Sequence, residues 1–227
     1  MIQKLNEIKI NDNVARLEYR LPEPSNGQII LYKFDADKFN WRFENSKEPK
    51  TMAQWADTFP EKKFIMNGVY FHEDNLPSGL LISKGEQIGL RQFDLNLSGI
   101  ISLSPTVEII QTERTDIQLE RFKEAAQSYP FLIKNGQVAI ETDSEQYAVR
   151  SFIAIDQEGF IYLGVVQNVP ISLFGLAERM LAMDVPWATA INLDGGGSTG
   201  LVAEFDENYE RIDSLNPVPN IILLTEK

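Results

Sequence analysis

The segment from Ile191 to Val202, INLDGGGSTGLV, constrains the fold of this chain more than any other, because three consecutive glycines interrupt an apolar run. Glycine weakens helix and strand interiors, so the triplet indicates backbone that takes positive φ or approaches another group closely. Successive glycine N–H groups can form a concave nest for an anion, with Ser198 and Thr199 at its rim and Asp194 at its mouth. The segment therefore predicts a phosphate or sugar-phosphate site beside an acid or base. The alternative is a tight glycine turn between two core strands.

The size and composition of the chain limit its class. It has 227 residues, of which 43% are hydrophobic, enough to fill the core of a single domain over residues 1–227. A formal charge of −12 argues against nucleic acid or an anionic membrane as a partner, because the long-range field repels both. No run reaches the roughly 18 apolar residues that span a bilayer. The first residues lack the apolar region of a signal peptide, so we expect either a cytoplasmic protein or one whose leader was removed.

Metal and thiol chemistry finds little support in the sequence. The chain contains no cysteine, which excludes disulfides, thiolate metal sites and cysteine nucleophiles. His72 is the only histidine, and beside Glu73 and Asp74 it is more typical of a solvated loop than of a ligand. Metal-ligand spacing is absent, because the two acids are adjacent in sequence. We expect no metal site and no cofactor, and the need for a divalent ion stays open.

The distribution of apolar residues predicts many strands and a few helices. The predicted strands cover residues 14–21, 28–34, 39–43, 64–71, 80–82, 201–205 and 221–225, with two more between 95 and 112. Two hairpins are predicted over residues 131–140 and 151–166, the second with its turn at Gln157-Glu158-Gly159. The predicted helices cover residues 48–59 and 119–126 and a segment capped by Ser172. Asn135-Gly136 suits a type I′ hairpin turn. We therefore expect an α+β protein, a single domain with a mixed, strand-rich sheet flanked by a few helices.

Two known catalytic loops match the glycine segment only in part. Gly196 to Gly200 fits the G-x-S-x-G pattern, but a nucleophile elbow needs a following helix and a later histidine. A P-loop is excluded because no lysine follows the glycines. The D-x-G-G-G-S-T phosphate loop of actin-like ATPases is closer. However, Asp194 directly precedes the first glycine, and this shift would turn its carboxylate to the other face of a strand. A phosphate-loop ATPase or phosphatase is thus the less favoured alternative.

Four groups of residues between 64 and 202 carry a resemblance to a known family. They are MNGVYF from Met66 with PSGL from Pro77, AQSYPFL from Ala126 with Asn135-Gly136, Arg150-Ser151 with IDQEG from Ile155, and LDGGGS from Leu193. With these residues the chain resembles the phosphodiester glycosidase family. The family is also called the NAGPA domain, after the enzyme that uncovers mannose 6-phosphate by removing a capping N-acetylglucosamine. The chain departs from the family pattern at Val69 and at Tyr129, which replaces a glycine and would narrow the pocket or stack on a sugar ring.

The resemblance implies a hydrolase that cleaves a sugar-1-phosphodiester, or a related glycoside of a cell-envelope glycan or exopolysaccharide. The expected partner is therefore a sugar phosphate or a glycan. Glycosidases commonly use two carboxylates, because an alkoxide leaving group must be protonated. A phosphate leaving group is weakly basic, so one carboxylate with anion-stabilising donors can suffice. The alternative is a non-catalytic carbohydrate or cell-envelope binding module, favoured if Tyr70, Tyr129 and Trp187 line a cleft without a positioned carboxylate.

On this resemblance, Asp194 would activate water or stabilise the anomeric centre. Arg150 would pair bidentately with phosphate, a geometry that lysine cannot reproduce, and the alternative for it is a surface salt bridge. The anion cradle would consist of the amides of Gly195, Gly196 and Gly197 with Ser198.

Three more residues are assigned on the same resemblance. Asn67 is grouped with the catalytic residues and Gln127 with the substrate-binding residues. Both would form hydrogen bonds with sugar hydroxyls or phosphate oxygens. The alternative for both is a buried polar residue that satisfies backbone groups. Glu73 is the candidate second carboxylate, if one is needed.

Overall fold

The computed structural model describes residues 2–22, 26–89, 99–112 and 117–227. The chain folds into two compact units, the first comprising Met1–Ala36 and Pro130–Gly196 and the second Asp37–Tyr129 and Gly197–Lys227. Each unit is described by itself. The single domain expected over residues 1–227 stays a prediction.

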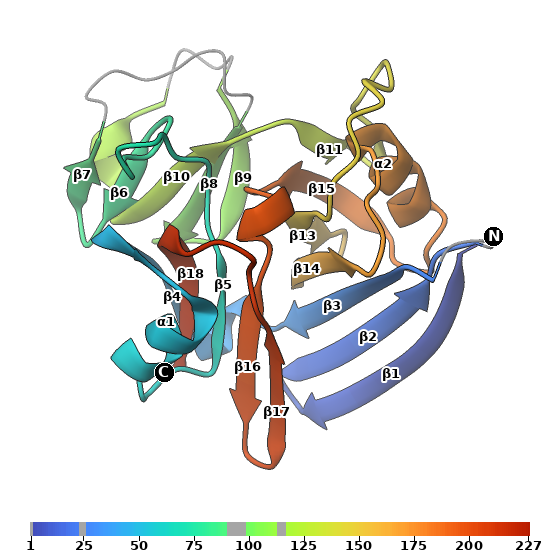
Figure 1. Cartoon of the computed structure of the whole chain (residues 1–227), viewed down its shortest axis with the longest axis horizontal. Coiled ribbons are helices and arrows are strands. Elements are labelled where there is room, and N and C mark those ends of the chain that lie inside the picture. The colour runs from blue at the N-terminus through green and yellow to red at the C-terminus, as the bar shows by residue number, and fades with distance from the viewer. Residues whose placement is uncertain (1, 23–25, 90–98, 113–116) are drawn as a thin grey trace. The chain divides into compact units, whose positions relative to one another are not determined.

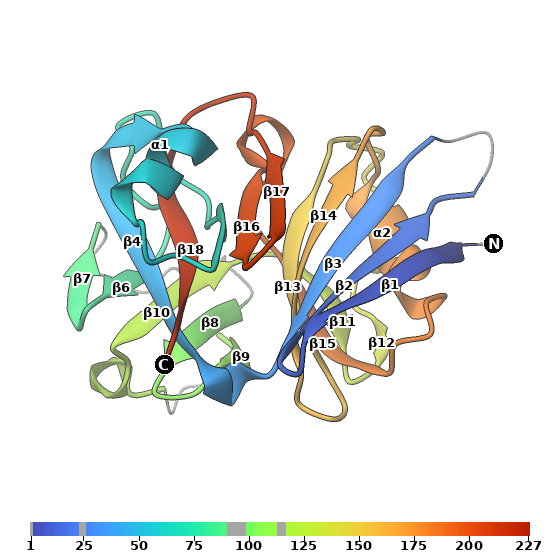
Figure 2. The ribbon, with the colours of Figure 1, turned by 90° about the horizontal axis from the view of Figure 1, so that it is seen from below.

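The first unit contains an eight-stranded sheet in the order β1-β2-β3-β14-β13-β15-β11-β12, antiparallel at every pairing. Its strands are β1 (Gln3–Asn11), β2 (Val14–Arg20), β3 (Gln28–Phe34), β11 (Phe131–Lys134), β12 (Gln137–Val138), β13 (Ser151–Asp156), β14 (Ile161–Gln167) and β15 (Trp187–Asn192). Figures 1 and 2 show β1, β2 and β3 side by side in blue. The pairing of β3 with β14 joins segments that lie far apart in the sequence.

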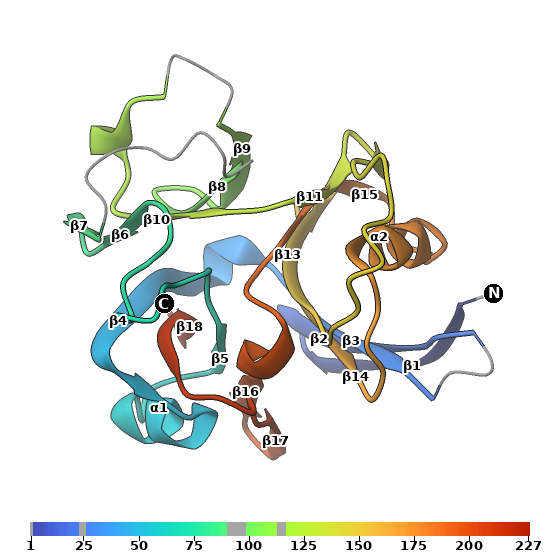
Figure 3. The same cartoon turned by 45° about the horizontal axis from the view of Figure 1, so that its top comes forward.

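Helix α2 (Leu173–Leu181) packs on β11 and β12 of this sheet. Figure 3 shows α2 near the labelled strands β11 and β15. Ser172 caps it, because its Oγ accepts the Gly175 N–H at 3.1 Å. The indole N–H of Trp187 donates to the carbonyl of Met180 at 2.7 Å and so ties the helix to β15. The helix predicted after Ser172 is confirmed. Its fully buried side chains are Leu176, Ala177 and Met180.

The second unit contains two five-stranded sheets with the orders β7-β6-β10-β8-β9 and β17-β16-β5-β18-β4. Their strands are β4 (Phe39–Lys50), β5 (Phe64–Asn67), β6 (Leu81–Ser83), β7 (Glu86–Ile88), β8 (Gly99–Ser104), β9 (Glu108–Gln111), β10 (Glu124–Ser128), β16 (Leu201–Phe205), β17 (Asn208–Ile212) and β18 (Val218–Glu226). Helix α1 (Met52–Thr58) packs on β5, β16 and β4 and buries Trp55. The described residues also form the 3₁₀ turns η1 (Ala36–Lys38), η2 (Leu119–Arg121) and η3 (Gly196–Ser198).

The expected α+β class is wrong. Antiparallel sheets dominate the described residues, which contain two α-helices, so the protein is mainly β. The helix predicted over 119–126 is replaced by η2 and β10. Ala125 and Ala126 are fully buried and pair with both β6 and β8, so sheet formation overrides the helix propensity of alanine. Strand β1 was not predicted, because its mostly exposed residues lack an apolar alternation.

The other predicted elements agree with the structure apart from their ends. Asn135 and Gly136 both have positive φ, as a type I′ turn requires. The first helix begins at Met52, because Thr51 forms a capping box with Gln54 while Pro49 belongs to β4. The strands expected between 95 and 112 are β8 and β9, and residues 95–98 lie outside the described residues. Within the described ranges, every helix is too short or too polar to cross a membrane.

The cap of α2 gives a direct test of what holds this helix. Ser172 Oγ accepts from Gly175 and also donates to Asp143 Oδ2 at 2.9 Å. We expect Ser172→Ala to lower the free energy of unfolding by about 1 kcal/mol, measured by chemical denaturation. Ser144 lies in an exposed loop, and Ser144→Ala should change the free energy by less than about 0.5 kcal/mol. An equal loss in both variants would argue against the capping role.

Candidate active site

In the first unit, the residues that flank β13 and β15 prolong the ladder between these strands. The two strands pair up to Asn192, and the Leu193 N–H then donates to the Ser151 carbonyl at 2.8 Å. Arg150 directly precedes β13 and Asp194 follows Leu193, so both lie just beyond the last hydrogen bond of this ladder. An ideal Cβ on Gly195 would lie 3.5 Å from the Arg150 Cδ, so the backbone after Asp194 runs close to Arg150. The predicted acid and the predicted phosphate ligand are therefore at the same end of the β13–β15 ladder.

The backbone after Asp194 is held by two hydrogen bonds. The Ser151 hydroxyl donates to the Asp194 carbonyl at 2.7 Å, and the Gly196 N–H donates to the Val149 carbonyl at 2.8 Å. A Cβ on Gly195 would lie 2.9 Å from the Val149 oxygen, and Gly196 has a φ of 60°. Gly195 thus allows a close approach of two backbone segments, and Gly196 adopts a left-handed conformation. An anion cradle built from the amides of Gly195, Gly196 and Gly197 would need the Gly196 N–H as a donor. In the structure this N–H donates to the Val149 carbonyl.

Backbone carbonyls orient the guanidinium of Arg150. Its Nε–H donates to the Ile171 carbonyl at 3.0 Å, and Nη2 donates to the Gln146 carbonyl. These bonds account for two of its five N–H donors and fix the plane in which the others lie.

Gly197 begins the part of the turn that belongs to the second unit. The Asn216 N–H donates to the Gly197 carbonyl at 2.9 Å, and a Cβ on Gly197 would lie 2.3 Å from Asn216 Nδ2. Ser198 and Thr199 are buried rather than placed at an exposed rim. Thr199 Oγ1 has no hydrogen-bond partner among the described residues.

Asn67 and Gln127 are buried at the ends of β5 and β10 in the second unit. Asn67 Oδ1 accepts the Gly200 N–H at 3.2 Å, while the Asn67 N–H donates to the Gly200 carbonyl at 3.1 Å. Gln127 Oε1 accepts the Leu80 N–H at 2.7 Å, while the Gln127 N–H donates to the Leu80 carbonyl at 2.8 Å. Both side chains form hydrogen bonds with nearby backbone groups, which was the alternative to substrate binding considered for them. Their contacts with substrate stay a prediction.

Glu73 and His72 are exposed, in the loop that follows Tyr70. The role of Glu73 as a second carboxylate stays a prediction. Across residues 2–22, 26–89, 99–112 and 117–227, no group of three or more histidine or acidic side chains is arranged to hold a metal ion.

Asn220 of β18 is a structural anchor that the sequence did not reveal. Its Oδ1 accepts the Val69 N–H at 2.7 Å, and its Nδ2 donates to the Val69 carbonyl at 3.1 Å. A Cβ on Gly68 would lie 2.1 Å from this Oδ1, which explains why Asn67-Gly68 interrupts an apolar run. The one signal in the sequence was a single asparagine just before the last apolar run, which begins at Ile221.

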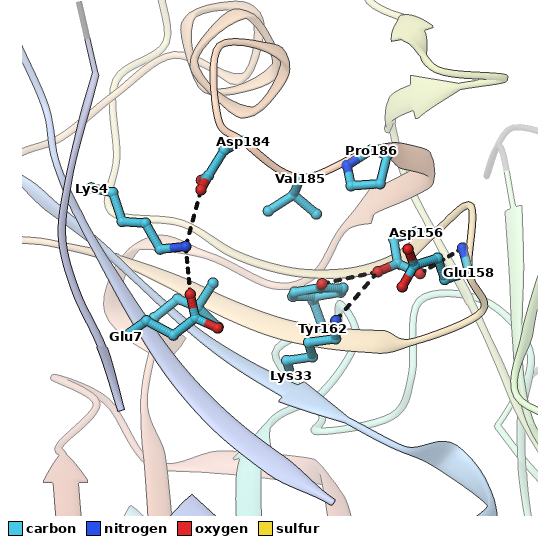
Figure 4. A pocket seen from close by; sticks show the side chains of 10 residues that line it. Lys4, Glu7, Lys33, Asp156, Glu158, Tyr162, Asp184, Val185 and Pro186 are labelled. Atoms are coloured by element: carbon cyan, nitrogen blue, oxygen red, sulfur yellow. Dashed lines mark hydrogen bonds and ion pairs between the residues drawn. The ribbon is translucent and has the colours of Figure 1, made fainter. Parts of the chain in front are cut away.

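A pocket of about 230 Å³ lies elsewhere in the first unit (Figure 4). Lys4 Nζ lies 2.6 Å from a carboxylate oxygen of Glu7 and 3.0 Å from one of Asp184. The Tyr162 hydroxyl donates to Asp156 at 2.9 Å, and Lys33 Nζ lies 4.0 Å from the same oxygen. The lining includes none of the predicted site residues, and its lysines pair with its acids, as in a structural ion-pair network.

The family described as phosphodiester glycosidase, NAGPA, matches residues 61–225 of the chain. No curated protein matches the sequence.

Solved structures share the fold at low sequence identity. A hypothetical protein from Synechocystis is 14% identical with a TM-score of 0.69, and the match covers 98% of this chain but 64% of that one. The zebrafish N-acetylglucosamine-1-phosphodiester alpha-N-acetylglucosaminidase catalytic domain, auto-inhibited by its pro-peptide, is 15% identical with a TM-score of 0.72. That match covers 100% of this chain and 88% of the zebrafish chain. A Burkholderia pseudomallei protein described as exported is 10% identical with a TM-score of 0.55, and the match covers 89% and 75% of the two chains.

The two constraints on the glycine turn can be separated by substitution. The Cβ of Gly195→Ala would press on a backbone oxygen, so we expect a loss of about 2 to 3 kcal/mol in unfolding free energy. The Cβ of Gly196→Ala meets nothing within 4 Å, and its left-handed backbone should cost about 1 kcal/mol. Gly196→Asn should recover part of that loss, because asparagine tolerates this conformation, whereas Gly195→Asn should not. Denaturant unfolding gives the ranking, and a reversed order would contradict it.

Asp184 beside the pocket gives a pH-dependent contribution to stability. Its pKa is lowered because the Tyr19 hydroxyl donates a hydrogen bond to it and Lys4 lies beside it. A carboxyl with a depressed folded pKa stabilises the protein above its unfolded pKa and loses this contribution as pH falls through the folded pKa. We expect Asp184→Asn to be less stable than wild type at pH 7 and the difference to shrink below about pH 4. Unfolding of both proteins across this range, with the exposed Asp57→Asn as control, measures it. A difference that stays constant with pH would refute the assignment.

Proposed function

The chain belongs to the phosphodiester glycosidase family, and we propose that it is a hydrolase that releases a sugar from a sugar-1-phosphodiester such as one of N-acetylglucosamine. The observation that supports this most is that Arg150 and Asp194 lie at the same end of the β13–β15 ladder. One side chain can bind the phosphodiester and the other can act at the anomeric carbon. The reaction needs both groups on one face.

In the proposed reaction, a water molecule attacks the anomeric carbon and the bond from that carbon to the phosphate oxygen breaks. Positive charge develops on the sugar ring and negative charge on the leaving phosphate. Asp194 takes the proton of the water or stabilises the cationic ring. Arg150 binds two phosphate oxygens and stabilises the charge that they gain. The products are the free sugar and a phosphate monoester, whose weak basicity removes the need for a second carboxylate to protonate it.

The surroundings of this pair suit the proposed roles. The carbonyls of Ile171 and Gln146 orient the guanidinium before substrate arrives, which lowers the entropy cost of positioning it. The Ser151 hydroxyl holds the backbone of Asp194. The contributions of Asn67, Gln127, Glu73, Ser198 and the glycine amides remain proposals on the family resemblance.

A non-catalytic carbohydrate-binding module is the second candidate function. The exposure of Tyr129, 42% of its surface, favours it, because an exposed aromatic ring can contact a sugar. Trp187, also considered for a binding surface, is instead buried against Tyr162.

Hydrolysis assays separate the two candidates. We expect the protein to release sugar from the methyl phosphodiester of N-acetylglucosamine-1-phosphate, or from the same diester of another sugar. Simple aryl glycosides of these sugars should stay intact, because their leaving group carries no phosphate. Sugar release is measured by chromatography. Cleavage of aryl glycosides alone, or of neither class, would contradict the proposed function.

Variants of the central pair test the mechanism. We expect Asp194→Asn to lower kcat by about 10² to 10⁴ while the unfolding midpoint stays unchanged, because the amide cannot take a proton. Arg150→Lys should lower kcat/KM by about tenfold or more, since lysine keeps the charge but not the fork. Asp206→Asn, in the exposed turn between β16 and β17, serves as the matched control. Full activity of Asp194→Asn would remove this carboxylate from the mechanism.

A further inference from the structure

Tyr70 and Tyr129 form an aromatic pair in the second unit. Their ring centroids are 4.8 Å apart and the ring planes are inclined by 36°. Tyr129 directly follows β10 and is 42% exposed, whereas Tyr70 follows the end of β5 and is partly buried. The less exposed ring therefore backs the more exposed one.

The backbone on both sides of Tyr70 is held firmly. Asn220 binds the N–H and the carbonyl of the preceding residue, Val69, with its side-chain amide. The Ser78 N–H donates to the Tyr70 carbonyl at 2.9 Å. These bonds come from a buried side chain and a neighbouring loop, so the fold fixes the backbone from which the Tyr70 ring projects.

The backbone below Tyr129 is tied to the same loop. Strand β10 is the central strand of its sheet, and Gln127 bonds both backbone groups of Leu80. Residues 78–80 thus bind the backbone of Tyr70 and that of Gln127, two residues before Tyr129. An aromatic surface that is ordered in advance loses little entropy when a ligand binds.

We propose that Tyr129, backed by Tyr70, is a platform on which the pyranose ring of a neutral sugar stacks. This inference rests on the proposed function and assigns the pair to recognition of the glycan part of the substrate. The apolar C–H face of a pyranose packs on an aromatic ring, and the phenolic hydroxyl can bond a sugar hydroxyl. The formal charge of −12 favours a neutral sugar over an acidic one at this ring, where no local anion site is assigned.

Binding can be tested without turnover. The protein has seven tyrosines, so labelling with 3-fluorotyrosine gives few ¹⁹F signals, and Tyr129→Phe and Tyr70→Phe assign those of the pair. The probes are tetrasaccharides of N-acetylglucosamine, glucose and mannose, each up to about 10 mM to cover millimolar dissociation constants. We expect at least one probe to shift the signals of Tyr129 and Tyr70 saturably. The signals of Tyr147 and Tyr209, which are exposed at 62% and 59%, should stay in place.

Turnover adds a second readout. For a phosphodiester that carries such an oligosaccharide, we expect Tyr129→Ala to raise KM about tenfold, a loss of about 1.4 kcal/mol in binding, with kcat within about twofold. Tyr129→Phe should keep most of the affinity, and Tyr209→Ala should match wild type.

The outcomes separate this inference from the proposed function. A saturable shift without any hydrolysis supports the platform and refutes the hydrolase. Hydrolysis with an unchanged KM in Tyr129→Ala and no shift by any tetrasaccharide overturns the platform and leaves the hydrolase standing. A shift caused only by benzyl alcohol also overturns it, because that ligand offers an aromatic ring and no pyranose.

Discussion

The structure of the first unit at the proposed site depends on one close approach of backbone to backbone. Just after β15, the backbone of Gly195 lies against Val149 and Arg150, which precede β13. The approach is so close that a side chain does not fit at position 195. Hydrogen bonds from Leu193 and Gly196 close this contact on both sides. Because of it, the segments that carry Arg150 and Asp194 stay close together beyond the last strand pair. A bulkier residue at position 195 would push the two segments apart.

In the second unit, buried side-chain amides hold the backbone in place by hydrogen bonds. A buried amide group is costly unless its polar atoms are hydrogen-bonded. Asn67, Gln127 and Asn220 meet this demand by binding the backbone of Gly200, Leu80 and Val69, respectively. Each amide fixes a segment that regular strand pairing does not reach. The fold therefore uses polar side chains in the interior to shape loops, and their positions near the strand ends need not by themselves indicate contact with a substrate.

The sequence predicted local structure well where the signal was local. The capped helix after Ser172 and the hairpin at Asn135-Gly136 follow from hydrogen bonds and dihedral preferences within a few residues. The segment 119–126 failed for the opposite reason. Its alanines favour a helix in isolation, and only the neighbouring strands β6 and β8 make it a strand. The error in fold class follows from this, because pairing partners distant in sequence decide whether an apolar segment joins a sheet.

The sequence by itself determined that the chain bends sharply at three glycines after an aspartate, and its motifs identified the family. It also determined that any anion must be bound locally, since the overall charge is strongly negative. Only the tertiary structure decided that Arg150 and Asp194 lie at the same end of the β13–β15 ladder, that the Gly196 N–H donates to the Val149 carbonyl, and that Asn220 anchors the loop before Tyr70. The reason is physical: a glycine's freedom is visible in its residue type, whereas the partner that occupies the space of the missing side chain comes from a distant strand.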